Sequence, residues 1–123
     1  MTRRVVVVDD SPDVRLTMSL VLRRPDAEIV CVPDGASARD AVFEAPTVAV
    51  VMDYRLEDER GTDVIPRLRA EGYDGAVVLF SAHITSELED QADLLGVGTI
   101  AKTEIDDLQA FIDAALGRAA SSD

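Results

Sequence analysis

The chain has 123 residues, a formal net charge of -12 and a sequence isoelectric point of about 4.3. Its length suffices for one domain with a hydrophobic core, and so negative a surface would repel nucleic acid phosphates and anionic lipids. No apolar stretch is long enough to cross a bilayer or to serve as the core of a signal peptide. We therefore expect a cytoplasmic protein that binds neither nucleic acid nor membranes directly.

Short apolar runs alternate with segments of helical periodicity along the chain. The segments that predict helices begin at Pro12, behind the N-cap residue Ser11, and then cover about 35–44, 62–70, 85–95 and 104–116. The runs that predict strands are residues 4–8, 28–32, 48–52, 76–80 and 99–101. The valine-rich runs among them are typical of strands covered on both faces. Five β-α units with right-handed crossovers thus predict an α/β fold, an open, doubly wound parallel sheet.

Local signals also mark the ends of the later helices. Ser86 and Glu89 have the spacing of a capping box for the fourth helix. We expect Thr103 to cap the fifth helix and Gly117 to close it. The sequence therefore predicts one domain over residues 1–118, followed by a short, loose C-terminal tail over residues 119–123.

Polar side chains stand where four of the five predicted strands end. Asp9 and Asp10 follow the first strand, Asp53 the third, Ser81 the fourth and Lys102, the only lysine in the chain, the fifth. Each of them alone could be an ordinary turn or surface group. In open α/β sheets, however, ligands bind outside the carboxyl ends of the strands. We therefore expect these side chains to converge on one cleft.

The chemistry of such a cleft depends on how three carboxylates tolerate one another. Either protonation or a bound cation can relieve their repulsion. Oxygen ligands favour magnesium or calcium, and a few carboxylates with open positions suit magnesium, which shares its shell with waters and a phosphate. With magnesium present, an aspartate can attack phosphorus and form an acyl phosphate. A lysine and a serine hydroxyl would then bind the oxygens of the transferred group.

Four segments of the chain resemble the site segments of a known family. They are VVVVDDSPDV, VVMDYRL, VVLFSA and TIAKTE, and they are similar to those of receiver domains, the phosphoacceptor modules of two-component response regulators, including the chemotaxis regulators. Each segment alone is a weak signal, but together and in order they are specific. The resemblance extends from about Thr2 to Leu116, and Gly61 fits the turn glycine of the family. It implies a flavodoxin-like (βα)5 fold with strand order 2-1-3-4-5.

The resemblance assigns the phosphoryl-transfer chemistry and its Mg²⁺ cofactor to particular residues. Asp53 would be the phosphoacceptor and, with Asp9 and Asp10, a metal ligand. Asp10 would bind Mg²⁺ directly, Asp9 directly or through water. The backbone carbonyl of Arg55 would complete the protein's share of the metal shell.

Further residues would bind the phosphoryl group, report it or tune its lifetime. Ser81 would be the hydroxyl that senses the phosphoryl group, and Lys102 would pair with it. Thr99 occupies the place of the family's switch residue. His83 and the side chain of Arg55 stand where they could control the access of water, although a lone histidine is more often an ordinary surface residue.

The partners implied are those of two-component signalling. A sensor histidine kinase or a phosphotransfer protein would donate the phosphoryl group. The signal would reach a downstream protein partner or an output domain of a longer chain. The resemblance also implies a monomer, or a weak homodimer formed through the segments 85–95, 99–101 and 104–116. Such a domain is not an enzyme in the usual sense, although it promotes its own phosphorylation and dephosphorylation.

The chain departs from the family pattern at three positions. Thr103 stands where a proline usually follows the lysine, and a cis bond before a residue other than proline costs about 2.5–4 kcal/mol. Thr99 is small where the family often has an aromatic residue, so no aromatic swing can occur there. Glu57 replaces a common loop proline. We expect these departures to affect signal output more than the chemistry.

Two other functions remain as alternatives. The missing aromatic residue at Thr99 favours a receiver-like interaction or dimerisation module that works without phosphate. A phosphohydrolase with an aspartyl-phosphate intermediate ranks lower, because Arg55 occupies the place of its usual second aspartate. The acidic run 57–59 could hold another cation, but its spacing fits no calcium loop, and we interpret it as a solvated loop.

Overall fold

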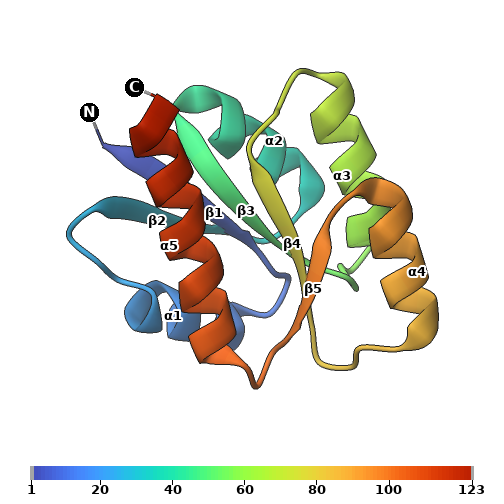
Figure 1. Cartoon of the computed structure of the whole chain (residues 1–123). Helices are drawn as coiled ribbons and strands as arrows, with labels where there is room; N and C mark the ends of the chain where they lie inside the picture. Colours follow the sequence, from blue (N-terminus) through green and yellow to red (C-terminus); the bar gives the residue numbers. More distant parts are fainter. Residues whose placement is uncertain (1, 123) are drawn as a thin grey trace.

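A five-stranded parallel sheet lies between two layers of helices (Figure 1). The computed structural model describes the backbone of residues 2–122 and the side chains of residues 2–120. The strands follow the order β2-β1-β3-β4-β5, which confirms the predicted fold class and strand order. In chain order the elements are β1 (Arg3–Val8), α1 (Pro12–Val21), β2 (Ala27–Val32), α2 (Gly35–Glu44), β3 (Thr47–Asp53), α3 (Gly61–Ala70), β4 (Ala76–Ser81), α4 (Ser86–Leu95), β5 (Gly98–Ala101) and α5 (Ile105–Ser122).

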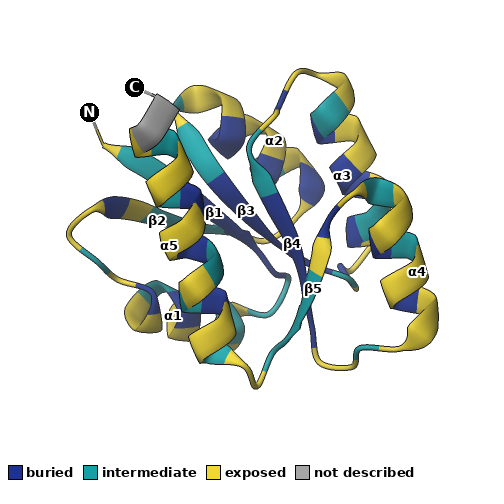
Figure 2. Cartoon of the chain, viewed as in Figure 1, coloured by how far each residue is buried: buried dark blue, intermediate teal, exposed yellow. Residues whose placement is uncertain are grey.

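The central strands β1, β3 and β4 are largely buried and serve two separate cores, one on each face of the sheet (Figure 2). Successive side chains of a strand point to opposite faces. Val6 and Val8 therefore pack in the core beneath α2, α3 and α4, whereas Val5 and Val7 pack in the one beneath α1 and α5. This double burial is the physical reason for the continuous valine runs of the sequence.

The register of the sheet brings the ends of distant strands to one edge. Val8, at the end of β1, is paired with Val32 on one side and with Met52 on the other. In the other half of the sheet, Ser81 at the end of β4 is paired with Ala101 at the end of β5. The residues that follow these positions consequently share the carboxyl edge of the sheet.

Side-chain caps fix the starts of α1, α2 and α4, and one of them differs from the prediction. Ser11 caps α1 as predicted, its hydroxyl accepting a hydrogen bond from the Val14 amide at 3.4 Å. Helix α4 is capped by Thr85 rather than by the predicted box that starts at Ser86. Thr85 has an extended backbone, and its Oγ1 accepts the Leu88 amide at 3.1 Å, while Ser86 is already helical. The capping-box prediction was therefore one residue late.

Helix α5 differs from the prediction at both ends. Its first turn is closed by the Leu108 amide, which donates to the carbonyl of Glu104 at 3.1 Å, so Thr103 lies in the preceding turn and does not cap it. The helix also continues through Gly117, which lacks the left-handed φ of a helix-ending glycine such as Gly96 at 70°. A glycine inside a helix costs about 1 kcal/mol relative to alanine, and α5 continues through Gly117 in spite of this cost. Residues 119–122 are thus helical and not a loose tail, and residue 123 lies outside the described residues.

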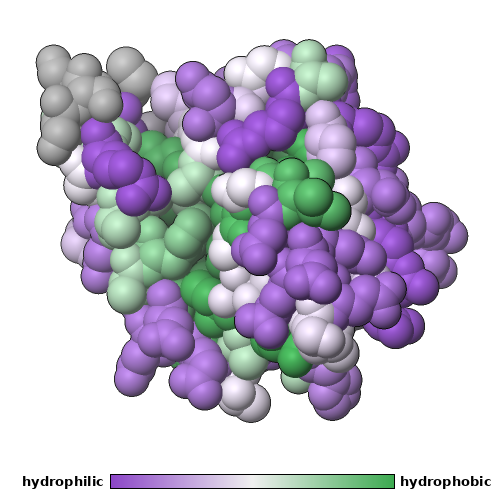
Figure 3. Space-filling model, turned by 45° about the vertical axis from the view of Figure 1, so that its right-hand side comes forward, coloured by the Kyte–Doolittle hydropathy of each residue, from purple (hydrophilic) through white to green (hydrophobic). Residues whose placement is uncertain are grey.

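Hydrophilic residues cover most of the surface that Figure 3 shows. Apolar areas interrupt it on the face in view. None of the helices formed by residues 2–122 combines the length and the apolar character needed to cross a lipid bilayer.

Candidate functional site

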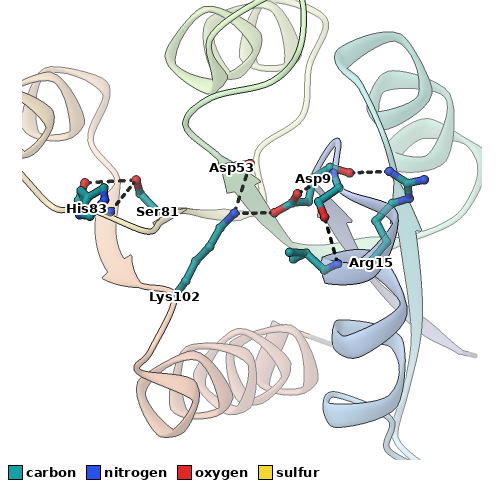
Figure 4. Close-up of polar contacts among 8 residues, drawn as sticks. Asp9, Arg15, Asp53, Ser81, His83 and Lys102 are labelled. Carbon is teal, nitrogen blue, oxygen red and sulfur yellow. Dashed lines mark hydrogen bonds and ion pairs between the residues drawn. The ribbon is translucent and has the colours of Figure 1, made fainter.

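Lys102 joins two buried aspartates at the carboxyl edge of the sheet. Its Nζ lies 2.7 Å from Oδ2 of Asp9 and 3.3 Å from Oδ2 of Asp53 (Figure 4). Asp9 directly follows β1, Asp53 ends β3 and Lys102 directly follows β5. The two aspartates are 2% and 7% exposed, so the ion pairs are shielded from water. The structure thus brings together the residues that the sequence placed at three different strand ends.

Asp9 is held on several sides. The amide of Ser11 donates to its Oδ1 at 2.9 Å, while its own amide donates to the carbonyl of Val32 at 3.0 Å. Its backbone carbonyl accepts a hydrogen bond from Nη1 of Arg15 at 2.9 Å (Figure 4). Sequence reasoning did not include Arg15 in the site. The available signal was a basic residue near the N-terminus of α1, where the helix dipole disfavours a positive charge.

Three carboxylates gather at this edge. Asp9, Asp10 and Asp53 each offer an oxygen, and these oxygens all lie within 4.8 Å of one another. Lys102 pairs with two of these aspartates, and its single positive charge against three carboxylates leaves the cluster negative. Oxygen ligands and residual negative charge suit a small divalent cation such as Mg²⁺, which typically binds one or two carboxylates and keeps several waters. The residues present therefore fit the expected metal.

The electrostatics of Asp53 and Lys102 reflect this crowding. Burial, together with the charge of Asp9, raises the pKa of Asp53 to about 6, although Lys102 and the backbone of Arg55 oppose the shift. Burial taken alone would lower the pKa of Lys102. The hydrogen bond with Asp9 and the charge of Asp53 outweigh that effect, so the pKa of Lys102 lies above its ordinary value. Lys102 consequently remains charged at neutral pH.

A cavity of about 360 Å³ opens beside Asp53. Besides Asp53, its lining includes four of the predicted site residues, Arg55, Ser81, His83 and Lys102, together with Tyr54. Sequence reasoning left Tyr54 out of the site, and its position directly after Asp53 was the only signal. The cavity provides room for a group attached to Asp53.

Ser81 and His83 interact with each other at the rim of this cavity. The hydroxyl of Ser81 donates to the carbonyl of His83 at 3.2 Å and accepts a hydrogen bond from the amide of His83 at 3.4 Å (Figure 4). Ser81 is 8% exposed, whereas His83 is exposed. The backbone of Ser81 also accepts the amide of Lys102 at 2.9 Å, which ties the end of β4 to the lysine.

Two of the three departures from the family pattern are Thr99, which lies in β5, and Thr103, which follows shortly after it. Thr99 is half-buried within β5, paired in register with Leu79, and is not part of the cavity lining. Every peptide bond within residues 2–122 is trans, including the one between Lys102 and Thr103.

Gly61 is required by the close approach of the chain to Asp53. Its φ is not positive, so this position does not need glycine for a left-handed backbone conformation. A Cβ at this position would collide with the backbone carbonyl of Asp53 and with the side chain of Met52. The amide of Gly61 donates to the carbonyl of Tyr54 at 2.7 Å. The start of α3 is therefore packed directly against the strand that carries Asp53.

This arrangement of sheet, acidic cluster and lysine is accompanied by a family match over most of the chain. Residues 5–113 match the response regulator receiver domain family. The chain therefore belongs to that family, and it is a receiver domain of the kind found in two-component response regulators. The three aspartates form an acidic cluster of the type at which receiver domains bind Mg²⁺.

Similar proteins include response regulators of mycobacteria. The transcriptional regulatory protein PrrA of Mycobacterium tuberculosis is 34% identical over 95 residues, which are 77% of this chain and 40% of that protein. The DNA-binding response regulator MtrA of Mycolicibacterium smegmatis is 35% identical over 71 residues, 58% of this chain and 31% of that protein. The chain thus spans about a third to two fifths of the length of these curated relatives.

Solved structures share the fold. A two-component response regulator of the LuxR family from Aurantimonas has a TM-score of 0.81 at 28% identity, covering 95% of this chain and 86% of that chain. A receiver domain protein from Methanospirillum hungatei has a TM-score of 0.86 at 15% identity and covers 100% of both chains. At the 15% identity of the protein from Methanospirillum hungatei, the likeness concerns the fold alone.

Proposed function

We propose that this receiver domain accepts a phosphoryl group on Asp53 from the phosphohistidine of a sensor histidine kinase or a phosphotransfer protein. The observation that carries the proposal is the position of Lys102, whose Nζ lies within 3.3 Å of both Asp9 and Asp53. A carboxylate oxygen of Asp53 attacks phosphorus, the bond from phosphorus to the histidine nitrogen breaks, and an acyl phosphate forms. Attack of water on phosphorus later releases inorganic phosphate and restores the carboxylate.

Asp53 and Lys102 have the protonation states that this reaction needs. With a pKa of about 6, Asp53 is largely ionised at neutral pH and is available as a nucleophile. Lys102 stays protonated and already lies beside a carboxylate oxygen of Asp53. A phosphoryl oxygen could thus take over the contact that the carboxylate of Asp53 now makes. Lysine suits this place because it is a compact point charge, whereas the planar fork of arginine needs more space.

Asp9, Asp10 and Asp53 would hold Mg²⁺, and the backbone carbonyl of Arg55 would join them. Support comes from the carboxylate oxygens within 4.8 Å of one another and from the oxygen-only donor set. When bound, Mg²⁺ would neutralise charge on the equatorial oxygens of the transferred group. Asp9 is kept in place for this task by the amide of Ser11 and by Lys102.

Ser81 would report the phosphoryl group to the surface. Its hydroxyl is bonded to the carbonyl of His83 and would have to leave that partner to donate to a phosphoryl oxygen. Thr85, the N-cap of α4, lies two residues beyond His83, so a movement of this segment would act on the start of α4. Because Thr99 has no aromatic ring to swing, we propose that the signal leaves through this segment, with Thr99 as a minor member of the switch.

The signal would alter contacts with a downstream protein partner or with an output domain of a longer chain. The chain matches only about a third to two fifths of its curated relatives, two of which are a transcriptional regulatory protein and a DNA-binding response regulator. A monomer or a weak homodimer through α4, β5 and α5 would be compatible with such contacts. The domain would promote its own phosphorylation and dephosphorylation without acting on another substrate.

The direct test is the gain of a phosphoryl group. The protein is incubated with Mg²⁺ and a small phosphodonor such as acetyl phosphate, and its intact mass is compared with that of the Asp53→Asn variant. We expect the parent to gain one phosphoryl group, the variant to gain none, and chelation of Mg²⁺ to suppress the gain.

A parent protein that gains no phosphoryl mass, under conditions where a known receiver domain does, would contradict the proposal. The alternative of an interaction module that works without phosphate would then be preferred. It is not favoured by the structure, because a module of that kind has no need of three clustered carboxylates and a half-buried lysine.

A further inference from the structure

The loop between β3 and α3, residues 54–60, is closed on itself next to the acidic cluster. The amide of Gly61 donates to the carbonyl of Tyr54 at 2.7 Å, and the amide of Leu56 donates to the carbonyl of Glu59 at 3.0 Å. Leu56 is 7% exposed and packs in the core beneath α2, α3 and α4. The same loop contains Arg55, whose backbone carbonyl is the proposed fourth protein ligand of the metal. The position of that ligand therefore depends on how firmly the loop is held.

One acidic residue of this loop is not solvated. Glu57 and Asp58 are exposed, as expected for the acidic run, but Glu59 is folded inward with a side chain that is 24% exposed. Its Oε2 accepts the amide of Gly35 at 3.1 Å, and its Oε1 pairs with the guanidinium of Arg67 on α3. The interpretation of residues 57–59 as a uniformly solvated loop is thus wrong for Glu59.

Gly35 is the first residue of α2, and its amide is one of the donors that no helical carbonyl can satisfy. The N-cap Asp34 accepts a different amide, that of Ser37, at 2.8 Å. Glu59 therefore accepts a hydrogen bond from a second amide at the N-terminus of α2. The positive end of the helix dipole lies there and stabilises a carboxylate. A Cβ on residue 35 would collide with the Glu59 carboxylate, so the glycine is what allows this approach.

We propose that Glu59 is a positioning residue for the metal site, an inference that rests on the proposed function. It connects the loop that carries Arg55 to two helices at once, through Gly35 on α2 and Arg67 on α3. Glu59 touches none of the reacting groups. Its effect is to hold the loop, and with it the carbonyl of Arg55, in place before Mg²⁺ arrives. Residues that orient metal ligands from outside the coordination shell commonly matter for affinity in this way.

The same groove offers a matched control. Arg39 on α2 and Glu71, directly after α3, form an ion pair at 2.6 Å between Nε and Oε1. Glu71, like Glu59, lines the groove of about 510 Å³ between the two helices, but it does not contact the loop. Glu71→Ala therefore removes one negative charge and one arginine pair from this region while leaving the loop attached.

The experiment compares Glu59→Ala, Glu59→Gln, Glu71→Ala and the parent. Mg²⁺ affinity is measured by isothermal titration calorimetry, and the rate of phosphoryl gain from acetyl phosphate is measured as a function of Mg²⁺. We expect Glu59→Ala to bind Mg²⁺ about 10-fold more weakly, the low end of the cost of losing an outer-shell partner. At saturating Mg²⁺ its maximal rate should remain close to that of the parent. Glu59→Gln keeps an acceptor for Gly35 and should recover part of the affinity.

The control decides between positioning and a general charge effect. Glu71→Ala should bind Mg²⁺ as the parent does. If Glu59→Ala and Glu71→Ala have the same Mg²⁺ affinity, Glu59 does not position the site. A reduced maximal rate at saturating Mg²⁺ with unchanged affinity would also overturn the inference.

Amide hydrogen exchange in the metal-free protein separates this inference from the proposed function. Faster exchange at Leu56 and Gly61 in Glu59→Ala, relative to both the parent and Glu71→Ala, supports the holding of the loop even if the parent fails to gain a phosphoryl group. Unchanged exchange at these two amides overturns it, whatever the outcome of the phosphorylation test.

Discussion

The charges at the carboxyl edge of the sheet and the ion pairs on the outer helices are built from similar residues in different surroundings. Asp9 and Asp53 meet Lys102 with side chains that are 3%, 9% and 24% exposed, respectively. Arg39 and Glu71 meet on the surface with side chains that are 56% and 38% exposed. Their contact distances are alike, 2.7 Å for Asp9 with Lys102 and 2.6 Å for Arg39 with Glu71.

The difference shows that burial, and not the contact distance, decides which charges carry chemistry. Coulombic interactions strengthen as the effective dielectric falls, and burial makes each unbalanced charge costly. At the carboxyl edge this raises the pKa of Asp53 to about 6 and prepares the cluster for a cation. On the helix surface water screens the same kind of pair, which then contributes little.

Replacement of Lys102 tests the buried side of this comparison most severely. We expect both Lys102→Met and Lys102→Arg to slow phosphoryl gain from acetyl phosphate by about 100-fold, the typical loss when one stabilising group is removed from a transition state. The arginine variant keeps the charge but not the compact shape. Rates are measured by intact mass over time at saturating Mg²⁺. A Lys102→Arg variant as fast as the parent would show that only charge is needed.

Asp53→Asn should stabilise the metal-free protein at neutral pH. Because burial, with the charge of Asp9, raises the folded-state pKa of Asp53 to about 6, ionisation of Asp53 weakens folding as the pH rises from about 4 through 6. The asparagine removes that cost, so the variant should gain about 1–3 kcal/mol at pH 7. Denaturant unfolding in the presence of a chelator measures the difference.

The pH dependence provides the check on this second prediction. Well below pH 4, Asp53 is protonated in both the folded and the unfolded state, and the advantage of the variant should disappear. Saturating Mg²⁺ at pH 7 should stabilise the parent more than Asp53→Asn. Equal stabilities of parent and variant across this pH range would contradict the assigned cause of the shift.

His83 shares a property with each of the two regions compared. It is exposed, like the ion pair on the outer helices, yet it lines the cavity beside Asp53. We expect His83→Ala to change the lifetime of the phosphorylated protein by a few-fold while leaving its unfolding free energy unchanged. Water reaches the acyl phosphate through this cavity in the proposed mechanism. Loss of phosphoryl mass after removal of the donor measures the lifetime, and an unchanged lifetime would remove His83 from the site.

Arg39→Ala represents the surface side of the comparison and should have the smallest effect. Its pair with Glu71 is open to water, and such pairs contribute little because of screening and side-chain entropy. We expect no measurable change in the urea midpoint or in phosphoryl gain. A clear loss of stability would show that exposed pairs on α2 matter more than the comparison implies.

Much of the site followed from residue types at strand ends. Asp9, Asp53 and Lys102 lie together because the parallel strands that precede them end at one edge of the sheet, which hydrophobic patterns already indicate. Helix ends were less predictable. Thr85 and Ser86 are both good caps, and only the local backbone shows that Thr85 is the one outside the helix. Gly117 stays helical because its surroundings outweigh its preference.

By itself the sequence determined the order of the elements, the two-sided burial of the central strands and the polar groups at the carboxyl edge, since all three depend on periodicity and chain direction. Only the tertiary structure decided which polar atoms meet. Lys102 reaches Asp9 across 93 positions, and Glu59 reaches Gly35 across 24. Such contacts require donor and acceptor to lie within hydrogen-bonding distance and in line. The packing of whole elements sets that geometry, and no local pattern of residues contains it.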